Sequence, residues 1–240
     1  MEAFKRVKLL IGSENYQKLK NASIAVFGIG GVGGYCAEAL ARSGVGRIAV
    51  FDNDVVAESN LNRQIIATVE NVGKAKVDLM EKRLKSINPE IVVECNNVFY
   101  LPENADNYDL SAYDYIVDAV DTVTAKLEII AQAKKVGVPV ISCMGTGGKT
   151  DPTMLKVADI ENTKVCPLAR VMRRELKARG IDKVKVVYSE EQPTICLKEE
   201  ENLEKKQSGR TAPPSMIFVP ATAGLILARE VVLDLIGEIK

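Results

Sequence analysis

A glycine-rich turn near the start of the chain constrains the fold more than any other sequence feature. Residues 23–28 (SIAVFG) form an apolar run of strand length, and GIGGVGG leads from it into a helical pattern that extends to about Arg42. This order matches G-x-G-x-x-G, in which glycines let main-chain N–H groups approach a phosphate at a helix N-terminus. The turn therefore predicts a nucleotide-binding α/β domain. The candidate binding residues within it are Gly28, Gly30, Gly31 and Gly33.

Strand and helix patterns alternate through the first 150 residues. Strands are expected at 23–28, 47–51, 91–95, 115–120 and 138–143, and helices from the glycine run to about Arg42, at about 74–86 and at 123–136. Such alternation indicates a parallel sheet with right-handed crossovers. Residues 54–72 are polar, irregular and too long for an ordinary connection, so we expect this segment to carry function.

The pattern changes after Thr150. Strands are expected at 155–160 and 184–188 on either side of a strongly basic helix, and an apolar helix at about 221–237. Residues 196–215 are charged and lack a period, which predicts a mobile loop. We expect one domain over residues 1–240. It would consist of a nucleotide-binding part at 1–150 and an extension at 151–240 that adds antiparallel strands and faces the substrate.

The composition excludes several kinds of site. Lys plus Arg and Asp plus Glu number 32 each, so any nucleic-acid or membrane partner must meet a local patch. The chain has no histidine, which excludes mechanisms and metal sites that need an imidazole. No C-x-x-C pair occurs, the N-terminus lacks the apolar core of a signal peptide, and the longest apolar stretch is interrupted. We therefore expect a cytoplasmic protein without a membrane partner.

Two of the five cysteines are worth separate predictions. Cys143 ends an apolar strand and is expected in the core. Cys166 precedes Pro167 at the start of a helix, where a lowered thiol pKa would make it a weak candidate nucleophile.

Polar residues follow the second strand in an unusual concentration. Asp52 lies about 20 residues after the glycines, where it suits a ribose hydroxyl, although this position fits NAD equally well. The following run, DNDVVAESNLNRQ, supplies amide and guanidinium donors, with Lys76 in the next helix and Asp121 at a strand end. Cationic side chains can neutralise a triphosphate and an aspartate can hold magnesium. The set favours nucleotidyl transfer over hydride transfer.

Four motifs in order, G-x-G-G-x-G, D-x-D-x-V-x-x-S-N-x-x-R-Q, G-x-x-K and D-x-x-D, resemble the ThiF/MoeB/ubiquitin-activating superfamily over about residues 4–150. The resemblance implies a Rossmann-like adenylating fold, ATP and Mg²⁺ as cofactors, and a homodimer with nucleotide sites near the interface. It places Asp52 on the ribose. It places Asn60, Arg63 and Lys76 on the phosphates, with Asp54 in the same nucleotide-binding set.

The same resemblance implies catalytic roles for three residues. Arg63 would act on the phosphates, and Asp121 matches the aspartate that the family associates with magnesium. Arg6, in FKRVKLLIG, is similar to an N-terminal arginine that family members bring to the partner subunit's nucleotide.

The second half resembles one branch, the tRNA threonylcarbamoyladenosine dehydratases. The matching blocks are MGTGGKTDPT at 144–153, PLAR at 167–170, VYSE at 187–190, TAP at 211–213 and FVP at 218–220. This resemblance implies ATP-dependent cyclisation of threonylcarbamoyladenosine in tRNA, next to the anticodon, through adenylation of its carboxylate. Lys149 and Asp151 would then contact the substrate, although both could equally be turn residues.

A basic stripe supports an RNA partner independently. Eight basic and two acidic residues lie between Lys164 and Lys185, and four of the basic ones recur at i, i+3, i+4 and i+7. These four are Arg170, Arg173, Arg174 and Lys177. They could bind an RNA backbone, and the alternative is an ordinary solvated helix face.

Three other functions remain open at this point. The chain could adenylate the C-terminus of a ubiquitin-like sulfur carrier, although many such enzymes carry two C-x-x-C zinc pairs that this sequence lacks. It could be a non-catalytic, nucleotide-dependent scaffold that passes sulfur or proteins between partners, including a sulfur-transfer protein. An NAD-dependent dehydrogenase is the remaining possibility.

Overall fold

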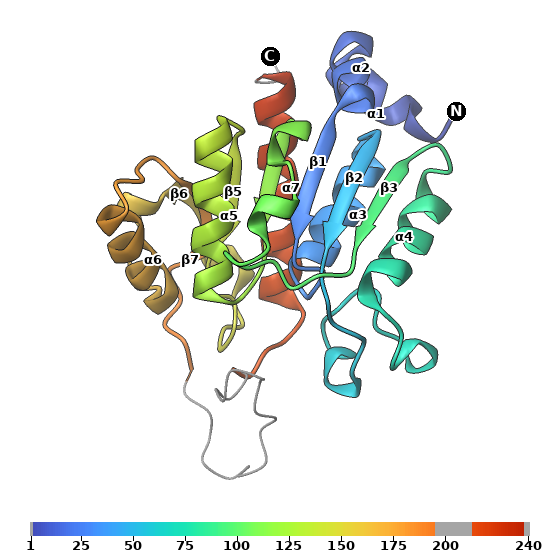
Figure 1. Cartoon of the computed structure of the whole chain (residues 1–240). Coiled ribbons are helices and arrows are strands. Elements are labelled where there is room, and N and C mark those ends of the chain that lie inside the picture. Colours follow the sequence, from blue (N-terminus) through green and yellow to red (C-terminus); the bar gives the residue numbers. More distant parts are fainter. Residues whose placement is uncertain (1, 195–212, 238–240) are drawn as a thin grey trace.

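The strands form one seven-stranded sheet in the computed structural model, which describes residues 2–194 and 213–237 (Figure 1). The strand order is β3-β2-β1-β4-β5-β7-β6. The strands are β1 (Ser23–Phe27), β2 (Arg47–Phe51), β3 (Val92–Asn96), β4 (Tyr115–Asp118), β5 (Val140–Cys143), β6 (Leu155–Asp159) and β7 (Lys185–Ser189). Every neighbouring pair is parallel except β6 with β7. The predicted fold, a mainly parallel α/β sheet with an antiparallel addition in the second half, is confirmed.

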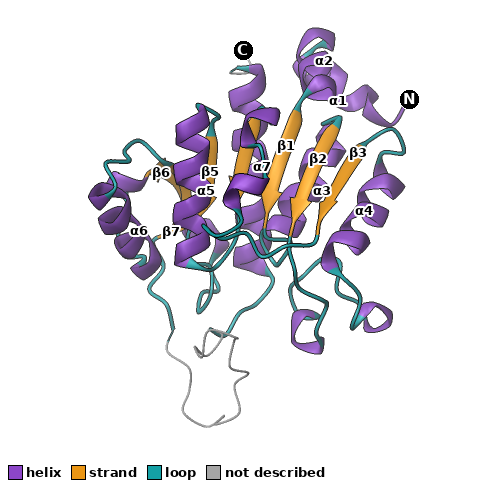
Figure 2. Ribbon diagram, viewed as in Figure 1, coloured by secondary structure: helices purple, strands orange, loops and turns teal. Residues whose placement is uncertain are grey.

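Helices cover both faces of the sheet (Figure 2). The α-helices of the described residues are α1 (Lys5–Ile11), α2 (Ser13–Asn21), α3 (Gly33–Ser43), α4 (Lys76–Ile87), α5 (Val123–Val136), α6 (Pro167–Ala178) and α7 (Phe218–Ile236). Alternate residues of β1 enter two separate cores. Ile24 and Val26 pack with side chains of α3, α4 and α7, whereas Ala25 and Phe27 pack with those of α5 and α6. This alternation is the period of two that a strand buried on both faces requires.

Most element boundaries lie close to the predicted ones. The helix 123–136 ends where expected because Gly137 adopts a left-handed conformation, with φ of 74°. The apolar C-terminal helix begins three residues earlier than predicted, at Phe218, and the strand predicted to reach residue 120 ends at Asp118. The predicted loop at 196–215 lies outside the described residues except for 213–215.

Two short N-terminal helices, α1 and α2, lie at the end of the sheet where the parallel strands begin (Figure 1). They form a small third core in which Phe4, Tyr16 and Leu19 pack against Ile236 of α7. The opposite end of the sheet, where β1, β2 and β4 terminate, carries the glycine turn and the long polar segment. No helix within residues 2–194 and 213–237 is both long and apolar enough to cross a membrane.

Candidate active site

The glycine turn connects β1 to α3 and has no room for side chains at two of its positions. A Cβ atom at Gly33 would lie 1.8 Å from the Gly28 carbonyl oxygen, and one at Gly28 would lie 2.8 Å from the Ala119 oxygen. Gly28 also has a φ of 86°, which disfavours any other residue. The turn can therefore form only with glycine at both positions.

The N–H groups of this turn are available for a ligand. Gly28 donates to Phe51 and Gly34 donates to Gly30, whereas no described residue accepts a hydrogen bond from the N–H of Gly30, Gly31 or Gly33. These donors lie at the N-terminus of α3, where the helix dipole also favours an anion. The geometry is that of a phosphate-binding turn.

Asp52, directly after β2, fastens the polar segment to the glycine turn. One carboxylate oxygen accepts a 2.6 Å hydrogen bond from the Ile29 N–H, and the other accepts from the Asp54 N–H at 2.8 Å. Burial raises the pKa of the Asp52 carboxyl, while Lys76 and these two N–H groups act in the opposite direction. The structure thus places Asp52 against the turn, and its contact with a ribose stays a prediction.

The S-N-x-x-R-Q element packs over the glycine turn. A Cβ atom added at Gly31 would lie 3.4 Å from the Cγ atom of Arg63. The Arg63 guanidinium donates a hydrogen bond to the Ser59 carbonyl at 2.7 Å. The buried Asn60 accepts the Ala57 N–H through its side-chain oxygen, so its NH₂ group remains as the donor. The sequence motif predicted both residues beside this turn, and their contacts with a nucleotide stay predictions.

Gln64 was quoted within the same motif but was not selected as a site residue. The side chain is buried, and its Nε2 lies 3.8 Å from the Cβ position of Gly30. Its Oε1 is buried without a hydrogen-bond partner in the described part of the chain. An unpaired buried acceptor is costly. Gln64 therefore lies beside the turn with an acceptor that a donor group of a bound ligand could satisfy.

Lys76 is buried, although a lysine at a helix start is usually solvated. It is the first residue of α4, and its Nζ lies 2.7 Å from a carboxylate oxygen of the exposed Asp54. The main chains of the same two residues are also hydrogen bonded, at 3.0 Å. The ion pair and the main-chain hydrogen bond together attach the polar segment to the start of α4. They also hold the Lys76 ammonium among the nucleotide-binding candidates.

The loop after β4 forms the floor of the glycine turn. Ala119 donates its N–H to the Phe27 carbonyl at 2.8 Å, and its methyl group lies 3.2 Å from the Cβ position of Gly33. Asp121 follows on the exposed side of this loop and accepts from the Thr122 hydroxyl at 3.3 Å. The structure therefore brings Asp121 to the same edge of the sheet as the glycine turn and Arg63.

Helix α7 reaches the site from the far end of the sequence, which was not predicted. Pro220 lies 3.5 Å from the Cβ position of Gly31. One turn further along, a Cβ atom at Gly224 would lie 2.3 Å from the Val32 carbonyl oxygen. The absence of a side chain at Gly224 thus permits α7 to touch the turn itself, and an isolated glycine in an apolar run was the only sequence signal.

The loop after β5 contains the two residues predicted to meet the substrate. Lys149 is buried, its Nζ donates to the Ser189 carbonyl at 3.1 Å, and burial lowers the pKa of its amine. Asp151 caps the short helical turn that follows, because it accepts from the N–H and the hydroxyl of Thr153 at 2.8 and 2.6 Å. These contacts give Asp151 a structural role in the turn, and the hydrogen bond to Ser189 links the Lys149 amine to β7.

The basic stripe of α6 is not uniform. Arg173 is half-buried and donates to the Thr163 carbonyl and hydroxyl at 2.8 and 2.7 Å, so it holds the preceding loop. Arg170, Arg174 and Lys177 are exposed, and Arg174 pairs with Glu175 at 2.8 Å. The start of α6 lies beside the loop after β5. A Cβ atom added at Gly145 of that loop would lie 3.7 Å from the Leu168 Cβ and 3.8 Å from the Cys166 Sγ. Of the four residues of the stripe, only Arg170, Arg174 and Lys177 can therefore offer their charges to an RNA.

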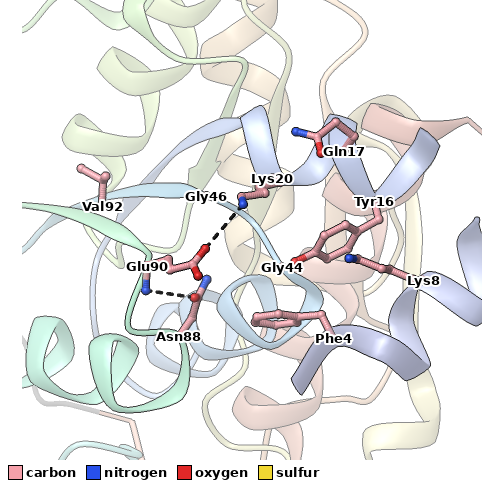
Figure 3. Close-up of a pocket in the computed structure, with 10 residues that line it drawn as sticks. All are labelled: Phe4, Lys8, Tyr16, Gln17, Lys20, Gly44, Gly46, Asn88, Glu90 and Val92. Atoms are coloured by element: carbon pink, nitrogen blue, oxygen red, sulfur yellow. Dashed lines mark hydrogen bonds and ion pairs between the residues drawn. The ribbon is translucent and has the colours of Figure 1, made fainter. Parts of the chain in front are cut away.

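Arg6 lies far from the glycine turn of its own chain, on the exposed side of α1 at the opposite end of the sheet. Near it, a hollow of about 300 Å³ is lined by Phe4, Tyr16 and Lys20 among others (Figure 3). Lys20 and Glu90 form an ion pair there at 3.4 Å. No nucleotide-binding candidate lines this hollow.

Comparison with known proteins identifies the family. The ThiF family model matches residues 4–238. The chain belongs to the ThiF family. A tRNA threonylcarbamoyladenosine dehydratase of Bacillus subtilis is 43% identical and is aligned over all of this chain and 97% of its own length. The Escherichia coli tRNA N6-threonylcarbamoyladenosine dehydratase in complex with ATP has a TM-score of 0.87 and 33% identity, over 98% of this chain and 93% of the other. A sulfur carrier protein adenylyltransferase of Thermus thermophilus is 38% identical but is aligned over only 55% of this chain and 48% of its own length.

The two cysteines of this ThiF-family chain that were selected from the sequence, Cys143 and Cys166, are both buried. Cys143 is buried, as predicted, and burial raises its thiol pKa to about 12. Cys166 stands directly before α6, as predicted, but its side chain is also buried. Its role as a nucleophile would require the thiol to become accessible.

The metal prediction rests on one carboxylate. Among the described residues, no group of three or more acidic or cysteine side chains could hold a metal ion. Magnesium commonly keeps several waters and binds through one or two carboxylates together with substrate phosphates. Asp121, exposed beside the phosphate-binding turn, fits that kind of site.

Proposed function

We propose that this chain is an ATP-dependent tRNA threonylcarbamoyladenosine dehydratase. The observation that carries the proposal is the likeness to named dehydratases along the whole chain, including the β5 loop, α6 and α7, and not only along the nucleotide-binding half. The glycine turn with its available N–H donors supports ATP as the substrate that activates the carboxylate.

The proposed reaction has two steps. A carboxylate oxygen of threonylcarbamoyladenosine attacks the α-phosphorus of ATP, the bond from that phosphorus to the bridging oxygen breaks, and pyrophosphate leaves. A nucleophile within the same modified base then attacks the acyl carbon of the adenylate, and AMP leaves with the former carboxylate oxygen. The net change in the base is the loss of one water, and neither step needs a histidine or an enzyme thiol.

All nucleotide-binding candidates except Asp54 have a place in this scheme. The N–H groups of the glycine turn and the side chains of Asn60, Arg63 and Lys76 would hold the phosphates, and Asp52 would hold the ribose. Asp121 would hold Mg²⁺, which supplies charge neutralisation on the phosphates when it is bound. The enzyme thus contributes positioning and electrostatic stabilisation of the leaving pyrophosphate.

A homodimer is part of the proposal, with Arg6 reaching the partner subunit's nucleotide. The N-terminal helix supports this arrangement. Leu9 and Leu10 of α1 are 78% and 71% exposed, and Leu10 lines an apolar hollow of about 540 Å³ between α1 and α7. Exposed leucines beside an apolar hollow are typical of a surface that another chain covers.

A tRNA partner supports the proposal of a cytoplasmic enzyme and suggests a role for the exposed residues of α6. The triple variant Arg170→Gln, Arg174→Gln, Lys177→Gln should weaken tRNA binding and flatten the plot of log affinity against log salt concentration. Each lost phosphate contact should reduce that slope by about 0.7 to 0.9. Filter binding at several salt concentrations measures both quantities.

A charge-matched variant provides the control for this test. Lys18, Lys82 and Lys135 are exposed lysines of α2, α4 and α5, and their joint replacement by glutamine changes the net charge equally. If the two triple variants show the same salt dependence, the α6 residues form an ordinary solvated face.

Lys149→Met should leave the melting temperature equal or higher while it lowers tRNA cyclisation by about tenfold or more. Burial lowers the amine pKa, so the folded state disfavours the charged form, and this penalty is present while the amine is charged. Removing the amine relieves the penalty, while the hydrogen bond to the Ser189 carbonyl and the contact to substrate are lost. Calorimetry and a cyclisation assay measure the two effects. Lys164→Met, at an exposed lysine nearby, is the control; full activity of Lys149→Met would make Lys149 a residue of the loop alone.

Mass spectrometry of tRNA nucleosides tests the proposed function directly. Purified protein, ATP and magnesium should convert threonylcarbamoyladenosine in tRNA into a product lighter by one water, with release of AMP and pyrophosphate. The principal rival is adenylation of a sulfur carrier, which would give ATP–pyrophosphate exchange that depends on a carrier protein with a Gly-Gly tail. No change in tRNA together with carrier-dependent exchange would reject the proposal. Co-purification tests the further proposal that a sulfur-transfer protein docks on this enzyme.

A further inference from the structure

Three polar side chains form a closed group inside the protein, directly beneath the candidate site. Asp118 ends β4, Lys126 lies in α5 and Ser142 lies in β5, and all three are 0% exposed. One oxygen of Asp118 accepts from the Lys126 amine at 2.9 Å and from the Ser142 hydroxyl at 2.5 Å. The Lys126 amine also donates to the Ser142 oxygen at 3.2 Å. We refer to these three residues as the buried triad.

Stability alone does not account for the buried triad. Removing a carboxylate and an ammonium from water costs several kcal/mol for each ion, and replacing such a pair with apolar residues is often neutral or stabilising. An ion pair in this position constrains geometry more strongly than apolar side chains would, because charged hydrogen bonds have narrow distances and angles. The relevant question is therefore what the group holds in place.

The buried triad holds the loop from Ala119 to Thr122 at both ends. The second oxygen of Asp118 accepts the Val120 N–H at 3.2 Å. At the other end, the main-chain N–H of Lys126 donates to the Thr122 carbonyl at 3.0 Å and begins α5. The loop is only four residues long, so anchoring both ends also fixes Asp121 between them.

This short loop is in van der Waals contact with the phosphate-binding turn. The Ala119 oxygen and the Val120 nitrogen lie 2.8 and 3.0 Å from the Cβ position of Gly28. A small displacement of the loop would therefore move Asp121 relative to the turn, or open space behind the turn itself. Displacements of about 0.5 Å are large for a site whose groups must converge on a triphosphate.

We infer that Asp118, Lys126 and Ser142 are positioning residues, which lock the 119–122 loop so that the Asp121 carboxylate faces magnesium-bound ATP. The inference rests on the proposed function only in that the site binds ATP and magnesium. It does not depend on which carboxylic acid is adenylated or on a tRNA substrate. The buried triad therefore acts through the 119–122 loop and its Asp121 carboxylate, without contact with the substrate.

A pair of variants separates positioning from stability. Lys126→Met leaves the Asp118 carboxylate buried without its cation, so it should lower the melting temperature and ATP affinity together. The double variant Asp118→Leu, Lys126→Met removes both charges and should recover most of the melting temperature, but it lacks the acceptor for the Val120 N–H. In this double variant, ATP should bind at least about tenfold more weakly than in the wild type when magnesium is present.

Tyr115→Phe is the matched control on the same strand. Tyr115 begins β4, at the opposite end of the sheet from the site, and its hydroxyl donates to Asp234 at 2.6 Å. Its loss removes a largely buried hydrogen bond of β4 without disturbing the 119–122 loop. This variant should lose some stability and bind ATP as the wild type does.

Titration calorimetry of ATP with and without magnesium tests the inference without any tRNA. We expect the tenfold loss with magnesium and a difference below about threefold without it. A double variant that recovers both stability and magnesium-dependent ATP affinity would overturn the inference, as would a wild-type protein whose ATP affinity is indifferent to magnesium. If ATP binds as expected but tRNA is not cyclised, the proposed function fails while the positioning role stands.

Discussion

Arg63→Ala should lower ATP-dependent cyclisation by about a hundred- to a thousandfold and leave the melting temperature almost unchanged. The guanidinium lies beside the glycine turn, where its stem packs on Gly31, and negative charge develops on the phosphates as pyrophosphate leaves. Removing one preorganised donor from such a site costs about 10²–10³ in rate. The hydrogen bond that Arg63 donates to the Ser59 carbonyl lies at the surface, so its loss should cost little stability.

Two further variants make the Arg63 test specific. Arg63→Lys keeps the charge but loses the planar fork, and it should fall between the wild type and Arg63→Ala. Arg42→Ala removes one of the two arginines that pair with the largely buried Glu38 on α3, the helix that begins at the glycine turn, and should have wild-type turnover because Arg83 still pairs with Glu38. Steady-state assays of AMP release compare the three. If Arg63→Ala retains half of the wild-type rate, Arg63 has no place in the mechanism.

The sequence predicted the part of the site that is local along the chain. The glycine turn, Asp52 and the segment that contains Asn60 and Arg63 follow one another within about 40 residues, and their spacing encodes one structural unit. Fold class followed from the alternation of apolar runs, because each strand is buried on both faces. The N-terminal helices were not predicted, because both are short and Gly12 interrupts the sequence between them.

Contacts between distant segments could not be predicted in this way. Lys126 has the appearance of a solvated helix lysine, and its burial depends on Asp118 and Ser142 from two other elements. Arg173 has the spacing of an RNA-facing residue, yet its guanidinium bonds to the preceding loop. Gly224 has the sequence context of a glycine that weakens an apolar helix, yet its lack of a side chain lets the helix backbone approach the glycine turn. In each case, the role of the residue depends on its contact with a residue of another structural element.

The glycine turn provides the second large effect. Gly33→Ala should abolish measurable ATP binding, because the new methyl carbon would lie 1.8 Å from the Gly28 carbonyl oxygen. No rotamer relieves a collision of Cβ with main chain, so the turn must open and its N–H groups lose their common direction. We expect a clearly lower melting temperature and no heat of ATP binding in calorimetry.

Gly30→Ala distinguishes this collision from the mere addition of a methyl group. At Gly30 the nearest atom to a new Cβ is the side-chain nitrogen of Gln64, 3.8 Å away, so the turn can form unchanged and the melting temperature should stay near that of the wild type. The two alanine variants differ only in whether the main chain of the turn can close. If Gly33→Ala binds ATP normally, the phosphates do not rest on this turn, and the mechanism drawn from it is wrong.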